Sequence, residues 1–170
     1  MNEDQYPLDP ASIDWTSWRP SMRATLLFLH RGSEILLIHK KSGLGRGKVN
    51  APGGKIEQGE SASQAAVREV SEEVGIDVRN PEEMGILRFQ FIHGERLALH
   101  CVVFRSFEFS GEAHETPEAD PFWCPVDRVP YEKMWSDDQY WLPGLLQGGK
   151  FDADFVFDDE ELLWRNVRWR

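Results

Sequence analysis

The sequence predicts an α+β domain in which β-strands precede and follow a central helix. The chain has 170 residues, 41% of them hydrophobic and 12% aromatic, which suits one domain with a packed core. Apolar runs of strand length occur on both sides of a segment with helical character. Residues 1–20, with prolines at positions 7, 10 and 20, are expected to form an irregular arm, and residues 21–170 the domain itself.

The first half of the domain contains a predicted hairpin, a glycine-rich loop and a helix. Apolar runs at 24–29 and 35–38 predict two strands joined by a turn, and five glycines follow between positions 43 and 54. Ser61 and Gln64 have the spacing of a capping box, and Gly75 suits a helix C-terminus. The sequence therefore predicts a helix over 62–74.

The second half contains further strands and a second predicted helix. Apolar and polar residues alternate over 87–91, and a long β-type run covers 97–109. A helix is predicted from Ser136, with Gln139 at the capping-box offset, to about residue 147, with Pro143 bending it. A strand is predicted over 151–157, while 160–168 is compatible with either a helix or a strand.

Charge and composition exclude several classes of function. The formal net charge is −10, from 29 acidic residues against 19 Lys and Arg, which argues against binding a nucleic acid polymer. Because no apolar run is long enough for a membrane span and no basic leader is seen, we expect a cytoplasmic protein. Cys101 and Cys124 follow no metal or redox spacing and are expected to be reduced core residues.

The most informative segment is the predicted helix over 62–74. Glu69, Glu72 and Glu73 are spaced i, i+3 and i+4, so that a helix carries their carboxylates on one face. Their repulsion favours a divalent cation, and oxygen ligands suit Mg²⁺, with Mn²⁺ as the alternative. An ordinary exposed helix with an Arg68–Glu72 pair is the competing interpretation.

A longer pattern around this helix favours the metal site. Gly54 is followed after five residues by Glu60, and after seven more by the run Arg68-Glu69-Val70-Ser71-Glu72-Glu73-Val74-Gly75-Ile76. This segment matches the Nudix box without a mismatch, so the chain resembles the Nudix hydrolases. The resemblance implies an α/β/α sandwich with a mixed β-sheet and hydrolysis of a pyrophosphate bond in a nucleoside diphosphate derivative.

The resemblance also implies roles for individual residues. The implied catalytic residues are Glu69, Glu72, Glu73 and Arg68, of which Arg68 orients the glutamates. The implied metal ligands are the Gly53 carbonyl, Glu69, Glu72, Glu73 and Glu118, the last from the segment 115–118. Lys40 or Lys55 would hold a phosphate oxygen, and the choice of general base stays open.

Three further segments, 40–50, 115–118 and 134–143, resemble the branch of the family that hydrolyses oxidised purine nucleoside triphosphates such as 8-oxo-dGTP and 2-hydroxy-dATP. This similarity runs from about Thr25 to the C-terminus, and an aliphatic residue, Leu44, replaces an aromatic one of that branch. The implied substrate-binding residues are Thr25, Lys40, Asn50, Pro52, Gly53, Gly54, Lys55, Phe89, Trp135, Ser136, Asp137 and Asp138.

The proposed base pocket also makes physical sense. Trp135 offers a flat face for stacking, and Asn50, Asp137 and Asp138 offer hydrogen-bond groups. Two neighbouring buried carboxyls do not both ionise, so the pair can donate as well as accept. The competing interpretation is that 136–138 only caps the following helix.

Other functions stay open at this stage. The substrate could be a normal or methylated nucleoside triphosphate, ADP-ribose or an RNA end, although the acidic charge disfavours RNA. A non-catalytic nucleotide-binding module is the alternative from another class, and the intact acids Glu69, Glu72 and Glu73 argue against it. The expected partner is a small nucleotide, with no membrane contact, and the expected state is a monomer.

Overall fold

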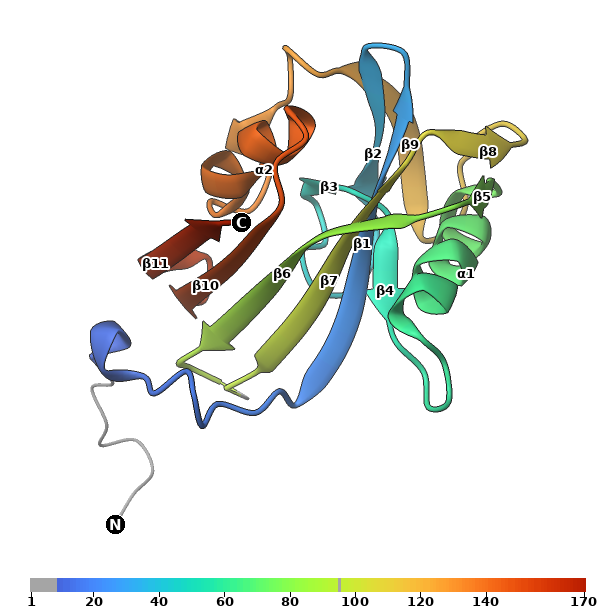
Figure 1. Ribbon diagram of the computed structural model, residues 1–170. Coiled ribbons are helices and arrows are strands. Elements are labelled where there is room, and N and C mark those ends of the chain that lie inside the picture. Colours follow the sequence, from blue (N-terminus) through green and yellow to red (C-terminus); the bar gives the residue numbers. More distant parts are fainter. Residues whose placement is uncertain (1–8, 95) are drawn as a thin grey trace.

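A computed structural model describes residues 9–94 and 96–170 of the chain (Figure 1). In chain order the elements are η2 Pro10–Ser12, β1 Met22–Arg31, β2 Glu34–Lys40, β3 Val49–Asn50, β4 Gly53–Lys55, α1 Ala62–Val74, β5 Asp77–Arg79, β6 Glu82–Phe91, β7 Ala98–Ser106, β8 Glu108–Ser110, β9 Ala119–Pro125, η3 Tyr131–Lys133, α2 Asp138–Leu146, β10 Phe151–Asp158 and β11 Glu161–Trp169. Runs of strands therefore precede and follow α1, as predicted.

The main sheet is mixed. Its strands follow the order β11-β10-β6-β7-β1-β2-β3, with β4 paired to β1 and β9 paired to β2. The pairs β1/β7 and β6/β10 are parallel, whereas the other pairs of this sheet are antiparallel. Strands β5 and β8 form a separate antiparallel ribbon next to α1. The predicted mixed sheet is confirmed.

Two apolar cores lie on opposite faces of the sheet. On one face, Ala66, Val70 and Val74 of α1 pack into a cluster with side chains of β1, β2 and β7. On the other face, Trp141 and Leu145 of α2 belong to a second cluster with side chains of β1, β6 and β10. Figure 1 shows α1 and α2 on the two sides of the strands. The sheet therefore lies between helices, as in the predicted α/β/α sandwich.

Local sequence signals account for α1. The Ser61 hydroxyl accepts a hydrogen bond from the amide of Gln64, and the Gln64 side chain accepts one from the amide of Ser61. Gly75 ends the helix with a φ of 79°, a left-handed conformation that favours glycine. The predicted helix over 62–74 is confirmed at both ends.

The predicted start of the second helix is wrong. Helix α2 begins at Asp138, and the Ser136 hydroxyl is buried without a hydrogen-bond partner in the described part of the chain. The Gln139 side chain donates instead to the Ser136 carbonyl, so no capping box forms. Pro143 lies inside α2, as predicted. The segment 160–168, which the sequence left open, forms strand β11.

Residues 9–20, the described part of the predicted arm, lie against the sheet. The indole of Trp15 stacks on that of Trp164, with ring centroids 5.9 Å apart. The backbone carbonyl of Trp15 accepts a hydrogen bond of 2.9 Å from the Arg88 guanidinium. The Trp18 indole N–H donates to the Gln90 side chain at 2.8 Å. These contacts fasten the segment to β6 and β11. Residues 1–8 of the arm lie outside the described residues, and a domain boundary at residue 20 stays a prediction.

Replacing Trp15 by Ala is expected to lower the free energy of unfolding by about 1–2 kcal/mol, because an aromatic pair and the packing around Arg88 are lost. Chemical denaturation measures this change, and Trp15→Phe, which keeps a ring, should lose less. Equal stability of Trp15→Ala and the unmodified chain would contradict a fastening role for this segment.

No helix within the described ranges is both long and apolar enough for a membrane span.

Candidate active site

A cavity of about 640 Å³ is bounded by α1, the loop after β2, and the strands β1, β6 and β7. The predicted site residues that line it are Thr25, Lys40, Asn50, Gly53, Gly54, Lys55, Glu69, Glu72, Glu73, Phe89, Glu118, Trp135, Asp137 and Asp138. Pro52, Arg68 and Ser136 are not among the lining residues. The Pro52 carbonyl accepts a hydrogen bond from the amide of Leu27, so this residue fixes the loop instead.

Carboxylates gather at one end of the cavity. Oxygen atoms of Glu69, Glu73 and Glu118 all lie within 4.8 Å of one another. Glu73 is 5% exposed and accepts a hydrogen bond of 3.1 Å from the amide of Gly53. The Thr116 hydroxyl donates to the Glu73 carbonyl at 2.7 Å, which holds the loop carrying Glu118 against the end of α1. Residues distant in the sequence therefore form one acidic group.

The electrostatics of this group suit a divalent cation. Burial raises the pKa of Glu73 to about 7, and burial also raises the pKa of Glu69. Charges that are costly to bury alone become stable when a cation neutralises them. The donors are hard carboxylate oxygens, which fit Mg²⁺ or Mn²⁺ and give zinc no preferred ligand. The residues present therefore fit the metal that the sequence predicted.

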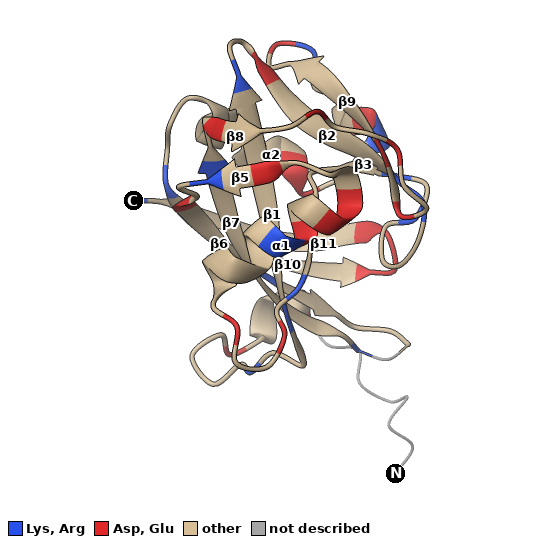
Figure 2. Ribbon diagram, turned by 90° about the vertical axis from the view of Figure 1, so that its right-hand side faces the viewer, with Lys and Arg blue, Asp and Glu red and all other residues tan. Residues whose placement is uncertain are grey.

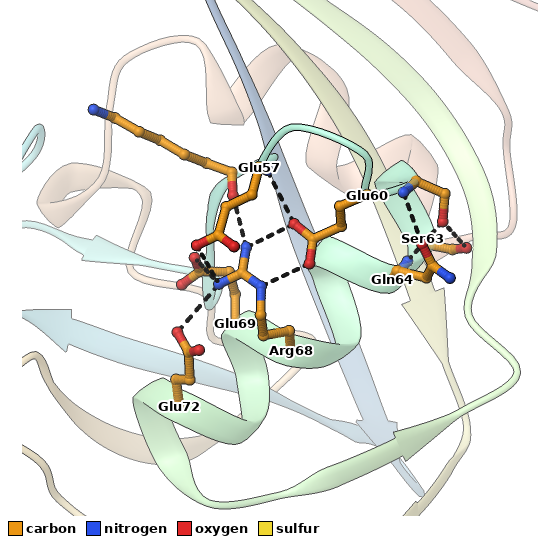
Figure 3. A network of polar contacts seen from close by, with 9 residues as sticks. Glu57, Glu60, Ser63, Gln64, Arg68, Glu69 and Glu72 are labelled. Atoms are coloured by element: carbon orange, nitrogen blue, oxygen red, sulfur yellow. Dashed lines mark hydrogen bonds and ion pairs between the residues drawn. The ribbon is translucent and has the colours of Figure 1, made fainter.

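Arg68 holds the acids of the helix in place (Figure 3). Its guanidinium makes two hydrogen bonds to Glu60, of 2.7 and 2.8 Å, and one of 2.8 Å to Glu69. It also donates to Glu72 at 3.2 Å and to the Lys55 carbonyl at 2.9 Å. The pairing with Arg68 lowers the pKa of Glu60 to about 2. These contacts agree with an orienting role and place Arg68 behind the site.

Glu72 differs from the other two helix acids. Its side chain is 53% exposed, and it does not belong to the close group formed by Glu69, Glu73 and Glu118. It lines the cavity at the outer end of α1, and Figure 2 shows acidic residues along this helix. A metal-binding role for Glu72 stays a prediction.

Gly53 and Gly54, expected in a turn, belong to strand β4 and leave space for both the sheet and the acids. In strand β4, Gly53 pairs with Leu26 and Gly54 with Thr25. A Cβ atom on Gly53 would overlap the carbonyl of Thr25, and one on Gly54 would overlap the carboxylate of Glu69. Neither glycine has a positive φ, so close approach, and not a special backbone conformation, requires them.

Aromatic rings form the other end of the cavity. The indole of Trp135 meets Phe91 and Phe157 edge to face, with centroid distances of 5.9 and 5.4 Å. The ammonium of Lys48 lies 5.2 Å from the Trp135 ring centroid and 3.2 Å from a carboxylate oxygen of Glu160. These contacts fix the orientation of the indole, which lines the cavity. An indole face of this kind can stack on a planar ring.

The Asp137–Asp138 pair lies at this aromatic end. Asp137 and Asp138 are 2% and 3% exposed, and the indole N–H of Trp141 donates to Asp137 at 2.8 Å. One oxygen of Asp138 and the hydroxyl of Thr25 are buried without a partner in the described part of the chain. Burial raises the pKa of Asp137 to about 6, and burial and the charge of Asp137 raise the pKa of Asp138 well above its usual value. Both shifts favour a protonated carboxyl in the pair, and a pair that shares one proton can donate as well as accept.

These raised pKa values predict a pH dependence of stability. The folded chain holds protons on the pair that the unfolded chain releases near pH 4, so the free energy of unfolding falls as pH rises from about 4 through 6. Asp138→Asn removes a titrating group. Its stability relative to the unmodified chain is expected to increase as the pH rises above about 4. Urea denaturation at about pH 4.5 and about pH 8 tests this, and a pH-independent difference would contradict a shared proton.

Glu118 provides a separate test of the acidic group. Glu118→Gln is expected to lower kcat and to raise the Mg²⁺ concentration needed for half-maximal activity by roughly tenfold, because a charged ligand is lost. Glu115→Gln is the matched control, since Glu115 pairs with Lys41 outside the cavity. Unchanged Mg²⁺ dependence in Glu118→Gln would show that Glu118 is only an exposed loop acid.

Some contributors to the cavity were not predicted from the sequence. Cys101, which was expected in the core, is indeed buried and unbridged, but it also lines the cavity. Trp141 supplies the indole N–H that holds Asp137, and the i, i+4 spacing of these residues was an available signal. Lys48 supports Trp135 through a contact that depends on the fold of the loop 41–48.

Comparisons with known proteins identify the family of this chain. The NUDIX domain matches residues 20–145. An oxidized purine nucleoside triphosphate hydrolase from Danio rerio is 37% identical over 139 residues, which cover 82% of this chain and 88% of the relative. The protein of the same name from Mus musculus is 34% identical with the same coverage.

A more distant relative and a solved structure complete the comparison. An NAD-capped RNA hydrolase from Pseudomonas aeruginosa is 34% identical over 111 residues, which cover 65% of this chain and only 37% of the relative. The crystal structure of a Mutator MutT protein from Bacillus halodurans superposes with a TM-score of 0.77 at 30% identity, covering 86% of this chain and 97% of the other. Box residues, fold and relatives agree, and the chain belongs to the Nudix hydrolase family.

Proposed function

We propose that this Nudix hydrolase converts oxidised purine nucleoside triphosphates, such as 8-oxo-dGTP and 2-hydroxy-dATP, to the monophosphate and pyrophosphate, and so removes damaged nucleotides from the precursor pool. The observation that carries the proposal is the buried Asp137–Asp138 pair beside Trp135, in the same cavity as the acidic group. The names of the relatives from Danio rerio and Mus musculus support the same substrate class.

The aromatic end of the cavity would select the base. A protonated carboxyl and an ionised one present a donor and acceptors side by side, and oxidised purines offer a changed pattern of such groups. The unpaired oxygen of Asp138 and the unpaired hydroxyl of Thr25 would gain partners only when a polar ligand binds. Trp135 would stack on the ring, and Asn50 lines the same wall.

The acidic end would carry out hydrolysis. Glu69, Glu73, Glu118 and the Gly53 carbonyl would hold Mg²⁺, with Glu72 as a further ligand, and the bound cation would neutralise phosphate charge and make water a stronger nucleophile. Lys40 and Lys55 line the cavity, where they would hold phosphate oxygens. Water adds to one phosphorus, the P–O bond to pyrophosphate breaks, and a carboxylate accepts the proton of the water.

A competition among substrates tests this function. The intact chain with MgCl₂ is assayed with 8-oxo-dGTP, 2-hydroxy-dATP, dGTP, ADP-ribose and an NAD-capped RNA, and product release is measured for each. We expect kcat/KM for 8-oxo-dGTP to exceed that for dGTP by at least tenfold. A ratio near one, or faster hydrolysis of ADP-ribose or the capped RNA, would overturn the proposed substrate. The chain would then be a Nudix hydrolase that acts on another substrate.

We further propose that the chain acts as a monomer, in the cytoplasm, on small nucleotides alone. The net charge of −10 opposes binding to nucleic acid polymers, and the two cysteines are unbridged, as is usual in a reducing compartment. Light scattering after size-exclusion chromatography should give the mass of one chain, and a dimer mass would overturn the monomer proposal.

A further inference from the structure

A second pocket, of about 500 Å³, lies away from the catalytic cavity. Residues 18–20 of the N-terminal segment and side chains of β1, β6, β7, β10 and β11 line it, and it shares no lining residue with the catalytic cavity. On β6 its residues Ile86 and Arg88 alternate with Leu87 and Phe89, which line the catalytic cavity. The second pocket therefore lies on the opposite face of the sheet, the face that α1 covers further along the strands.

Three basic side chains of the second pocket lie opposite one another on adjacent strands. In the sheet register Arg23 of β1 is opposite His100 of β7, and His100 is opposite Arg88 of β6. Arg88 is in turn opposite Asp154 of β10. Neighbours of this kind point to the same face with Cβ atoms roughly 5 Å apart, and like charges at such positions destabilise a sheet. The His100 imidazole therefore lies between two guanidinium groups.

The acids in the second pocket are already paired with other cations. Asp154, with a side chain 3% exposed, accepts hydrogen bonds of 2.6 and 2.9 Å from Arg88 and one of 3.0 Å from Arg168. Asp152 accepts two hydrogen bonds, of 3.2 and 2.8 Å, from Arg170. Neither carboxylate is paired with a cation on the β1 side of the pocket.

Positive and polar groups on that side lack partners. Among the described residues, the guanidinium of Arg23 makes no hydrogen bond or ion pair, and that of Arg19 donates only to the neighbouring Trp18 carbonyl, at 3.0 Å. Nδ1 of His100 is buried and has no hydrogen-bond partner among the described residues. Burial, and then the charges of Arg23 and Arg88, lower the pKa of His100. The pocket thus keeps an excess of positive charge in a chain of net charge −10.

We propose that this second pocket binds the phosphate group of a small molecule, held by Arg19 and Arg23 next to His100. Guanidinium groups bind phosphate oxygens through paired, charge-assisted hydrogen bonds. The pocket volume exceeds that of a phosphate ion, and Trp18, Pro20 and Ile86 add an apolar wall. A phosphate monoester, with its organic part on this wall, fits the pocket better than free phosphate.

Nuclear magnetic resonance of the intact chain tests the proposal. The ¹⁵N-labelled protein, with EDTA present, is titrated with inorganic phosphate or with ribose 5-phosphate at constant ionic strength. The indole N–H signal of Trp18, assigned with Trp18→Phe, reports on the pocket. We expect saturable shifts, with affinity at least tenfold weaker in Arg23→Gln and unchanged in Arg128→Gln. Arg128 is the matched control because it is an exposed arginine outside both pockets.

Each outcome is decisive. Tighter binding of ribose 5-phosphate would identify a monoester as the ligand, and equal binding would identify free phosphate. Shifts no larger than those caused by NaCl, or equal affinity in Arg23→Gln and Arg128→Gln, would overturn the proposal. Loss of the shifts in Lys40→Gln but not in Arg23→Gln would also overturn it, because phosphate would then be bound in the catalytic cavity.

Discussion

Replacing Glu73 by Gln is expected to lower kcat by roughly a hundredfold or more while the chain stays folded. The carboxylate is almost fully buried and belongs to the acidic group with Glu69 and Glu118. The amide side chain keeps the shape and still accepts the hydrogen bond from the Gly53 amide, but it removes the charge that a cation needs.

Steady-state hydrolysis at saturating Mg²⁺, together with thermal unfolding, checks this expectation. Glu57→Gln is the matched control: Glu57 lines the outer part of the cavity and lies outside the acidic group, with a side chain 69% exposed. We expect its kcat to stay within about threefold of the unmodified chain. Turnover of Glu73→Gln close to that of the unmodified enzyme would refute the assignment of the acidic group.

Replacing either Asp137 or Asp138 by Asn is expected to change base selection more than catalysis. The substitution keeps the volume but changes which atoms donate and accept, so a buried group is left unpaired against the preferred base. A loss of about 1–3 kcal/mol follows, or about one to two decades in kcat/KM for the oxidised purine. The acidic group at the other end of the cavity is untouched, so hydrolysis of dGTP should change much less.

The decisive measurement is the ratio of kcat/KM for 8-oxo-dGTP over dGTP in the unmodified chain, both Asn variants and Trp135→Ala. Because the proposed recognition of 8-oxo-dGTP and of 2-hydroxy-dATP uses different proton arrangements of the pair, their pH profiles should also differ in the unmodified chain and converge in the variants. Asp127→Asn, which changes an exposed acid, should leave all ratios as they are. Ratios unmoved by all three changes in the pocket would exclude this pair from base recognition.

Local signals in the sequence were sufficient to predict α1. Its capping box, its glycine terminus and the carboxylate spacing all depend on residues within one helix, so their geometry follows from the helical repeat. The same kind of signal failed at Ser136, because neighbouring residues 136–138 are all suitable caps and tertiary packing decided among them. Strand β11 could not be assigned for a related reason, since its conformation depends on pairing with β10.

Long-range contacts account for the rest of the site. The hydrogen bond from the Thr116 hydroxyl to the Glu73 carbonyl holds the loop with Glu118 next to Glu73. The fold of the loop 41–48 brings the Lys48 ammonium over the Trp135 ring. The position of these residues depends on strand order, which no local pattern encodes. The resemblance to a known family supplied Glu118 as a candidate, whereas it gave no indication of the pairing between Trp141 and Asp137.

Gly53 and Gly54 of β4 restrict which substitutions this chain can accept. Gly53 makes room for the backbone of Thr25, and Gly54 makes room for the carboxylate of Glu69. A methyl group added at position 53 would therefore disturb the sheet, and one added at position 54 would disturb the acidic group. At position 53 the methyl group would separate β1 and β4, and at position 54 it would displace the carboxylate of Glu69. Substitutions at position 53, where the clash is with backbone, should therefore be tolerated least, and a redesign of substrate preference has to start elsewhere.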